Sequence, residues 1–345
     1  MPPLQTLVLK KDKEFALKRG HCWVYREAVK DIPASLSTGQ EVKIVSHKGD
    51  SLGIGFLDLD SPILIRRLEG KENESAPERI ARRLCEAIAL RRVWFNRGDT
   101  TGYRLLNGEG DGIPGLIIDR YGDALVMQIY TLGLEPFLDL MIKTLRRELP
   151  EIRWLFRRNQ VRRAQAVEGL LYGKEFSGRV EFLENGLKFF VDLKAGQKTG
   201  FFLDQRDNRQ MIRNIARGMR VANICGYTGG FTVSALAGGA TEVITIDSAG
   251  PALEEAARNL RLNGMQPEKN PLVKEDMFTW IEKADKAGFD LVILDPPSMA
   301  KNRTENSRAI KAYGKLNRGA ADLLKPGGFL FTASCSTHVS REDFL

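Results

Sequence analysis

The stretch VANICGYTGGF, residues 221–231, decides the fold of this chain. Its first residues are apolar or small, which is typical of a strand that is covered on both faces. Gly226, Gly229 and Gly230 follow, and they allow turns and close approaches that a Cβ would block. A helix is predicted from about residue 231 to residue 238. A ligand at this turn would therefore meet free backbone N–H groups.

The spacing of the glycines bears on the ligand. It does not match GxGxxG, the fingerprint that cradles a pyrophosphate, so a nicotinamide dehydrogenase is disfavoured and a ligand without phosphates fits better. A second strand is predicted over residues 242–246, and it ends at Asp247, about 20 residues after the first glycine. A carboxylate at that place can hold two ribose hydroxyls.

Strands and helices alternate through the rest of this region. After the second strand we expect a helix at 251–263, a strand at 272–275, a helix from about 278, and strands at 289–294 and 328–333. This alternation predicts an α/β fold with a doubly wound parallel sheet. Asp247, Asp276 and Asp295 each follow a strand, which places three carboxylates at the edge where such folds bind ligands.

Two smaller domains are predicted before this sheet. Residues 1–72 alternate short β-rich runs with turn residues, which favours a small antiparallel barrel in which Trp23 and Tyr25 are core aromatics more readily than base-stacking ones. Residues 73–190 predict a central α+β domain. Its expected elements are a helix at 77–96, strands at 103–106, 115–119 and 124–130, a helix at 135–148, and a strand at 153–156. A further strand is expected at 186–193. Residues 191–345 form the third predicted domain.

Composition bounds the class of protein. The chain has 345 residues, of which 43% are apolar, so it can bury more than one core. It has no run of 18 apolar residues and no charged-then-apolar leader, which disfavours a membrane or secreted protein and favours the cytoplasm. The four cysteines are far apart and follow no ligand pattern, so we expect neither disulfides nor a metal.

The net charge of +8 is compatible with a nucleic-acid partner. The basic residues form no tail and gather in local clusters, such as Arg157, Arg158, Arg162 and Arg163. A solvated surface is the alternative interpretation of such clusters.

Several motifs together resemble a known family. They are NICGYTGGF, TIDS, DPP and SCS in the last domain, GQKTGFFLDQRDNR and RLLNGEGDGIPGLIIDRYGD before it, and RGHCWVY near the start. This order is similar to the class I S-adenosylmethionine-dependent methyltransferases, in particular the PUA-linked 23S rRNA cytosine-5 methyltransferases. The resemblance implies a PUA-like RNA-binding domain, a central domain that helps to grip RNA, a Rossmann-like catalytic domain, S-adenosyl-L-methionine as cofactor, and large-subunit ribosomal RNA as partner.

The resemblance also implies which residues bind the cofactor. The candidates are Arg206, Gly226, Tyr227, Thr228, Gly229, Gly230, Phe231, Asp247, Ser248, Asp276 and Met277. The Arg206 guanidinium would pair with the carboxylate of the methionine moiety. The alternative for Asp204 and Arg206 is that they only brace a domain junction.

Carbon 5 of cytosine is not nucleophilic by itself, and a cysteine thiolate that adds to carbon 6 makes it so. The resemblance gives this role to Cys335 and places Asp295 against N3 or the exocyclic amine of the base. Capping the turn into the prolines is the alternative role for Asp295. Cys22, Cys85 and Cys225 are expected to be small core residues.

Ser298 follows the proline pair, where related enzymes carry a cysteine nucleophile or a base-stacking aromatic residue, so both of those chemistries are disfavoured. Three alternatives stay open: a purine methyltransferase on the same fold, a catalytically silent RNA-binding assembly factor and, last, a dehydrogenase. A homodimer also stays open, although no periodicity in the sequence indicates one. The chain stops before the last strands that this fold normally adds, so we expect an incomplete sheet.

Overall fold

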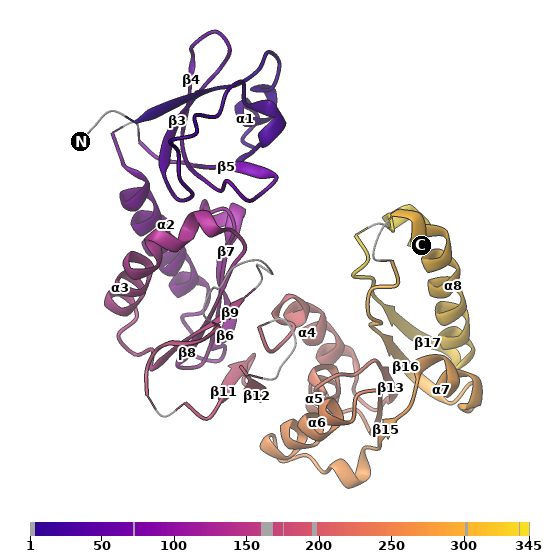
Figure 1. Cartoon of the computed structure of the whole chain (residues 1–345). Helices are drawn as coiled ribbons and strands as arrows, with labels where there is room; N and C mark the ends of the chain where they lie inside the picture. Colours follow the sequence, from indigo (N-terminus) through magenta and orange to yellow (C-terminus); the bar gives the residue numbers. More distant parts are fainter. Residues whose placement is uncertain are drawn as a thin grey trace. The chain divides into compact units, whose positions relative to one another are not determined.

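The computed structural model describes residues 4–71, 73–159, 168–174, 176–194, 199–300, 303–337 and 339–344. Its contacts divide the chain into two compact units, and Figure 1 labels many of their helices and strands. The first unit holds Met1–Phe182 and Val191–Phe201, and the second holds Leu183–Phe190 and Phe202–Leu345. No helix of the described part is long and apolar enough to cross a membrane.

The first sheet has five strands in the order β1-β3-β4-β5-β2. Its elements are β1 (Gln5–Val8), α1 (Phe15–Lys18), β2 (Trp23–Tyr25), η1 (Arg26–Ala28), β3 (Glu41–Val45), β4 (Ser51–Leu57) and β5 (Ile63–Leu68). β1 pairs with β3 in parallel, so the prediction of a wholly antiparallel barrel is wrong for this pair. The long connection from β1 to β3, which contains α1 and β2, allows a parallel pairing.

The prediction that Tyr25 is a core aromatic is also wrong. Val24 is buried, with 2% of its surface exposed, whereas Tyr25 is 40% exposed. Successive side chains of a strand point to opposite faces, so burying Val24 turns its two neighbours away from this core. Trp23 is half-buried, and its indole Nε1 donates a hydrogen bond to the Glu109 carboxylate at 2.9 Å.

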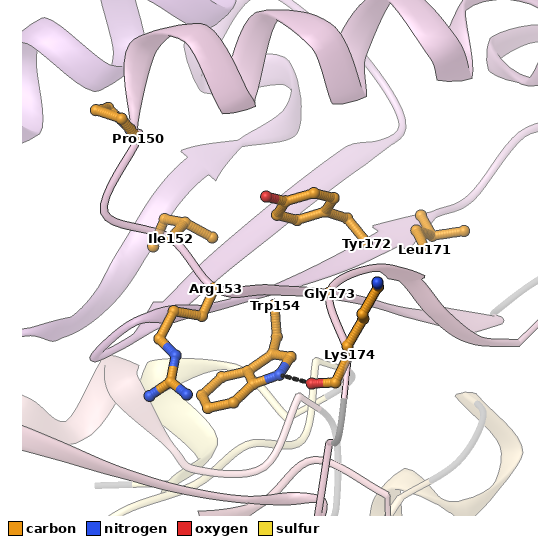
Figure 2. Close-up of a pocket in the computed structure, with 8 residues that line it drawn as sticks. All are labelled: Pro150, Ile152, Arg153, Trp154, Leu171, Tyr172, Gly173 and Lys174. Atoms are coloured by element: carbon orange, nitrogen blue, oxygen red, sulfur yellow. Dashed lines mark hydrogen bonds between the residues drawn. The ribbon is translucent and has the colours of Figure 1, made fainter.

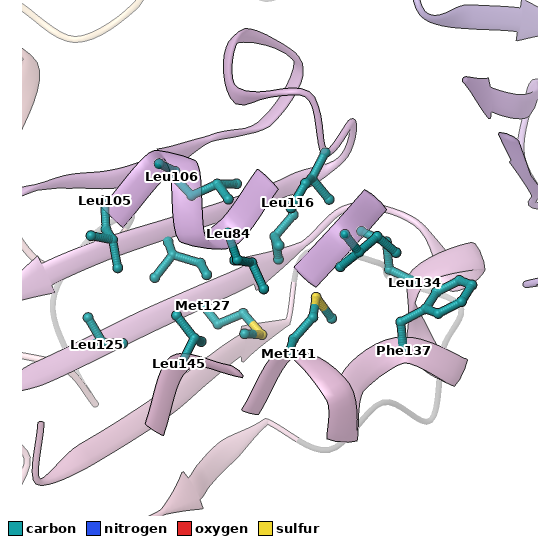
Figure 3. Close-up of a cluster of buried hydrophobic side chains, with 14 of the residues drawn as sticks. Leu84, Leu105, Leu106, Leu116, Leu125, Met127, Leu134, Phe137, Met141 and Leu145 are labelled. Carbon is teal, nitrogen blue, oxygen red and sulfur yellow. The ribbon is translucent and has the colours of Figure 1, made fainter. Parts of the chain in front are cut away.

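The central sheet follows in the same unit, with the order β10-β9-β8-β7-β6. The elements are α2 (Ala76–Trp94), β6 (Gly102–Asn107), η2 (Gly108–Asp111), β7 (Leu116–Tyr121), β8 (Ala124–Ile129), η3 (Leu132–Phe137), α3 (Leu138–Glu148), β9 (Trp154–Asn159) and β10 (Gly169–Tyr172). Ser75 and Glu78 form a capping box that starts α2. Apolar side chains of α2, α3 and the sheet, among them Leu84, Met127 and Leu145, fill the core between them (Figure 3).

A hairpin joins this region to the next. β11 (Arg179–Glu184) and β12 (Leu187–Asp192) form a two-stranded sheet, of which the sequence predicted only the second strand. The turn between them is Asn185-Gly186, and both residues have positive φ, at 50° and 78°. Asn-Gly is the preferred pair for a type I′ hairpin turn, so this signal was present in the sequence.

The last sheet has the order β15-β14-β13-β16-β17, and all its neighbouring strands are parallel. The elements are η4 (Leu203–Gln205), α4 (Arg206–Ile215), β13 (Arg220–Ile224), α5 (Gly230–Ala237), β14 (Glu242–Asp247), α6 (Gly250–Leu262), η5 (Pro267–Lys269), β15 (Leu272–Lys274), α7 (Met277–Lys283), β16 (Phe289–Leu294), η6 (Arg303–Glu305), α8 (Asn306–Asp322), β17 (Leu324–Thr332) and α9 (Arg341–Phe344). The predicted doubly wound α/β fold is confirmed.

Alternate side chains of β13 pack on the two faces of this sheet. Ala222 and Ile224 contact residues of α7 and α8, whereas Val221 contacts residues of α4 and α5. The strand order reverses at β13, because its two neighbours are β14 and β16. Doubly wound sheets bind ligands at the carboxyl ends of the strands beside such a switch point. The glycine turn after β13 lies at that place and is therefore the expected ligand site.

Candidate cofactor and active site

The glycine turn follows β13 directly. Cys225, Tyr227 and Gly229 all have positive φ, at 62°, 47° and 77°, so the backbone here is held in a conformation that side chains disfavour. The Gly226 N–H donates to the carbonyl of Ile246 at 2.9 Å, which ties the turn to β14. A Cβ on Gly226 would lie 2.4 Å from the Cγ2 of Thr245, so no larger residue fits. Strained backbone of this kind gathers at ligand sites.

The Asp247 carboxylate is fixed beside this turn. Its Oδ2 accepts the N–H of Tyr227 and its Oδ1 accepts the N–H of Ala249, each at 2.9 Å. A carboxylate oxygen can accept more than one hydrogen bond, so Asp247 can also accept two ribose hydroxyls. Ser248 is the next residue in the chain.

Hydrogen bonds of polar side chains hold the turn and the residues next to it. The Asn259 side-chain amide donates to the carbonyl of Thr228 at 2.9 Å, and the Thr228 hydroxyl is buried without a partner among the described residues. Asn223 donates to the hydroxyl of Thr232, which lies 2.7 Å from that of Thr245. A buried hydroxyl without a partner beside a strained glycine turn fits a polar ligand at this place.

Asp276 begins α7 at the end of the next strand along the sheet. Its Oδ1 accepts the N–H groups of Phe278 and Thr279, at 3.0 and 3.2 Å, as an N-cap. The Sδ of Met277 lies 3.4 Å from the Sγ of Cys225. The predicted acidic strand end and its neighbour therefore lie next to the glycine turn.

The Cys225 thiol shows that the three acidic strand ends meet. Burial raises its pKa to about 12, and the negative charges of Asp247, Asp295 and Asp276 contribute to the rise. The Coulomb interaction falls off with distance, so all three carboxylates lie near this one sulfur. The prediction that they share one edge of the sheet agrees with this arrangement.

The segment before β13 reaches the same edge. The Gln205 side-chain amide donates to the Oδ2 of Asp295 at 3.1 Å, and its own carbonyl accepts from Asn208 at 2.6 Å. Arg206, the predicted partner of the methionine carboxylate, is the next residue along the chain. The Nε of Arg206 donates to the Oδ1 of Asp207 at 3.1 Å.

A buried arginine that sequence reasoning missed lies one helical turn after Arg206. Arg209 is buried and donates to both carboxylate oxygens of Glu184, at 2.6 and 2.7 Å. It also donates to the carbonyl of Phe202 at 3.0 Å. This ion pair ties α4 to β11, and its position three residues after Arg206 was the available signal.

Cys335 lies just past the end of β17 and is exposed. Its thiol lies 3.8 Å from the carbonyl oxygen of Pro296, which follows Asp295. The Ala333 N–H donates to the carbonyl of Leu294 at 3.0 Å, so the two strand ends run side by side up to this point. The predicted nucleophile and the predicted acid therefore lie on adjacent segments of the sheet edge.

Ser336 joins these two segments, and sequence reasoning missed it. Its hydroxyl is buried and accepts the N–H of Met299 at 3.0 Å. It also lies 2.8 Å from the Tyr313 hydroxyl and 3.1 Å from that of Ser298. One hydroxyl thus links the Cys335 segment, the loop after the prolines and α8. A Ser-Cys-Ser motif was the signal, but its partners lie far away in the sequence.

No group of three or more histidine, cysteine or acidic side chains in the described ranges could hold a metal ion. None of the four cysteines, all of which lie in the described part of the chain, forms a disulfide.

Comparisons with known proteins agree with this geometry. The family model of S-adenosylmethionine-dependent methyltransferases matches residues 150–345, and the model of PUA-like domains matches residues 7–69. The chain belongs to the S-adenosylmethionine-dependent methyltransferase family. The cofactor of this methyltransferase is S-adenosylmethionine, and its Rossmann-like sheet carries the glycine turn.

The methyltransferase is similar to named relatives over almost its whole length. A ribosomal RNA large subunit methyltransferase of Deinococcus radiodurans is 40% identical over 99% of this chain and 87% of its own. Ribosomal RNA large subunit methyltransferase I of Erwinia tasmaniensis is 36% identical over 98% and 87%.

A solved structure is similar to the methyltransferase over almost all of its fold. The crystal structure of the methyltransferase SMU.776, complexed with SAH, has a TM-score of 0.84 and 26% identity. The match covers 99% of this chain and 88% of that one. That structure holds the product form of the cofactor, which agrees with a cofactor site on this fold.

Proposed function

We propose that this methyltransferase transfers a methyl group to carbon 5 of a cytosine in large-subunit ribosomal RNA, through a covalent bond to Cys335. The observation that carries the proposal is the Cys335 thiol 3.8 Å from the Pro296 carbonyl, beside Asp295. The names of the relatives from Deinococcus radiodurans and Erwinia tasmaniensis support the RNA substrate.

The cofactor residues are proposed from the sequence motifs, and the geometry supports them. Gly226 and Gly229 let the turn pack closely on its neighbours. Together with Gly230 they present its backbone to the ligand beside Tyr227, Thr228 and Phe231. Asp247 and Ser248 take the ribose, and Asp276 and Met277 lie beside the adenine. Oδ1 of Asp276 caps α7, and its Oδ2 has no partner within the described ranges, so it can accept from the ligand. Arg206 pairs with the methionine carboxylate.

Each catalytic residue then has a defined step. The Cys335 thiolate adds to carbon 6 of the cytosine, which raises the electron density on carbon 5. Asp295 takes up the proton that the Cys335 thiol loses and gives it to N3, so that the ring carries no full negative charge as the sulfur adds. When it is bound, S-adenosylmethionine supplies a methyl group on a sulfonium. Solvent then takes the carbon 5 proton, whose bonding electrons restore the ring double bond and expel Cys335 as the thiolate, while N3 returns its proton to Asp295.

Gln205 and Ser336 are proposed as positioning residues in this scheme. Gln205 fixes one oxygen of Asp295, which leaves the other for the base. Ser336 fixes the segment that carries Cys335 against the loop after Asp295. Orientation of reacting groups supplies a large share of catalysis, so both contacts should matter for rate.

We also propose a domain organisation for the chain. Residues 1–72 form the PUA-like RNA-binding domain, residues 73–190 the central domain, and residues 191–345 the methyltransferase domain. The cytoplasmic location follows from an RNA substrate of this kind, and the homodimer stays a prediction.

The test is incubation with tritiated S-adenosylmethionine and large-subunit rRNA that lacks its native modifications, followed by nucleoside analysis. Label in 5-methylcytidine is the expected result, and Cys335→Ala should abolish it while cofactor binding is kept. Label in a purine would refute the pyrimidine chemistry. Absence of any label, with intact RNA binding, would favour a silent assembly factor.

A further inference from the structure

A pocket of about 640 Å³ opens in the first unit, beside strands β9 and β10 of the central sheet (Figure 2). β10 is the edge strand of that sheet, and the pocket also reaches the chain that connects α3 to β9. Asp295 and Cys335 belong to the other unit. Its lining combines aromatic rings with cations.

Two aromatic rings line the pocket. The indole of Trp154 is fixed by a hydrogen bond from its Nε1 to the carbonyl of Lys174 at 2.9 Å. Tyr172 lies at the end of β10. Both side chains are only partly buried, so part of each ring is within reach of a ligand. The Phe176 ring centre lies 5.5 Å from that of Trp154. A guanidinium lies over each ring. The Cζ of Arg153 is 4.3 Å from the Trp154 ring centre, and the Cζ of Arg146 is 4.2 Å from the Tyr172 ring centre.

The cations beside these rings are available to a ligand. Arg146 and Lys174 are exposed and make no ion pair with any described residue. Arg153 contacts the Asp123 carboxylate at 3.4 Å, and 67% of its side chain is exposed, so this pair is weak. The pocket therefore offers flat stacking surfaces and uncompensated positive charge within one small area.

We infer that this pocket binds an unpaired nucleotide of the RNA, with its base stacked against Trp154 or Tyr172 and its phosphates paired with Arg146 and Lys174. Proteins recognise single-stranded RNA through such aromatic and guanidinium planes combined with basic side chains. An acidic peptide would use the cations but would gain little from two stacked rings. The inference rests on the proposed RNA substrate and adds a second contact point to it.

Two pocket variants and one control test this. Arg146→Ala/Lys174→Ala removes two exposed charges, and Tyr172→Leu removes one stacking ring while it keeps apolar volume. Arg217→Ala/Lys269→Ala removes two exposed charges from the other unit and serves as the matched control. RNA binding is measured by fluorescence anisotropy at several salt concentrations, with a single-stranded oligonucleotide and an rRNA fragment.

The pocket variants should bind RNA more weakly than the control. Loss of two phosphate contacts should lower the slope of log K against log salt by about 1.4. Loss of one stacked base should weaken binding about five- to 150-fold. The KM for RNA should rise to match, with kcat at saturating RNA and the Kd of the cofactor unchanged. An oligonucleotide with 5-iodouridine should photocrosslink to Trp154 or Tyr172 in the unmodified protein.

Affinity and salt slope equal to those of the control variant, together with crosslinks that map elsewhere, would overturn the inference. So would pocket variants that lose affinity for an acidic peptide but keep their affinity for RNA. These readouts measure binding and not methyl transfer. They therefore separate failure of the pocket from failure of the proposed cytosine chemistry.

Discussion

Ser336→Ala is the sharpest test of how the active site is positioned. Only 5% of the surface of Ser336 is exposed. The substitution removes its hydroxyl and leaves the Cβ in place. That hydroxyl accepts from the Met299 N–H and exchanges a hydrogen bond with Tyr313. Its removal leaves two polar groups in the interior without this partner.

The magnitude follows from those two groups. Each buried donor or acceptor left unsatisfied costs about 1–3 kcal/mol, so the local loss should be about 2–6 kcal/mol. Tyr313→Phe removes only the bond between the two hydroxyls and should cost about 1 kcal/mol. Since the two variants share that bond, the double variant should cost about 1 kcal/mol less than the sum of the single ones.

The rate of the covalent step should fall with the loss of positioning. A displacement of about 1 Å of a reacting group can cost about 100-fold, so we expect Ser336→Ala to lower kcat about 10- to 100-fold. The cofactor residues at the glycine turn make no contact with Ser336 in the described structure, so the Kd of S-adenosylmethionine should stay within about twofold. The assay is single-turnover trapping of RNA that contains 5-fluorocytidine, read as a covalent adduct on Cys335.

Ser340→Ala is the matched control. Its hydroxyl accepts the N–H of Asp343 and caps α9, so its loss should cost about 1 kcal/mol and removes no hydrogen bond of Ser336. If Ser336→Ala loses stability but traps the RNA as fast as Ser340→Ala does, Ser336 is structural and the positioning argument fails.

Three further predictions follow from single contacts. Gly226→Ala places a Cβ 2.4 Å from a threonine methyl of β14, so it should cost about 1–3 kcal/mol and weaken cofactor binding at least about tenfold by calorimetry. Gly314→Ala in α8 is the control, because the added Cβ would meet only a movable guanidinium, at 3.3 Å, and it should leave the cofactor affinity unchanged. Arg209→Met leaves the buried carboxylate of Glu184 unpaired, so the exchange of α4 amide hydrogens should report a loss of about 3–5 kcal/mol. Replacing both partners with apolar residues should recover most of that loss, and no recovery would contradict the ion-pair account. Because its pKa is raised from 9.0 to about 12, Cys225 should be alkylated at pH 8 on the order of a thousandfold more slowly than an ordinary thiol, with a rate that increases with pH above 9. Mass spectrometry measures this, and ordinary reactivity at pH 8 would contradict it.

The sequence predicted the parts of the fold that depend on local pattern. The bounds of β16 (Phe289–Leu294) were predicted to the residue. A short, nearly continuous apolar run is typical of a strand that is buried on both faces. The four-residue β10 was missed because a short edge strand carries little periodicity. Tyr25 was misassigned because the pattern alone did not show which face of its strand is buried.

The supporting residues of the site could not be predicted for a different reason. Gln205 meets Asp295 across 90 positions of sequence, and Ser336 meets Ser298 across 38. Such contacts depend on how strand ends line up in three dimensions, and no local pattern encodes that. The predicted site residues lay at strand ends and in a glycine turn, where chain position itself indicates the edge of the sheet.

The two cysteines at this edge differ in their suitability as nucleophile. Cys225 lies in the glycine turn, where burial and three carboxylates raise its pKa to about 12, so it stays a neutral thiol at physiological pH. A neutral thiol is a poor nucleophile, because the thiolate is the reactive form. Cys335 is exposed beside the Pro296 carbonyl, where a base can approach it. The same carboxylates that we propose for the cofactor site thus make Cys225 a poor nucleophile, so the proposed covalent step is assigned to Cys335.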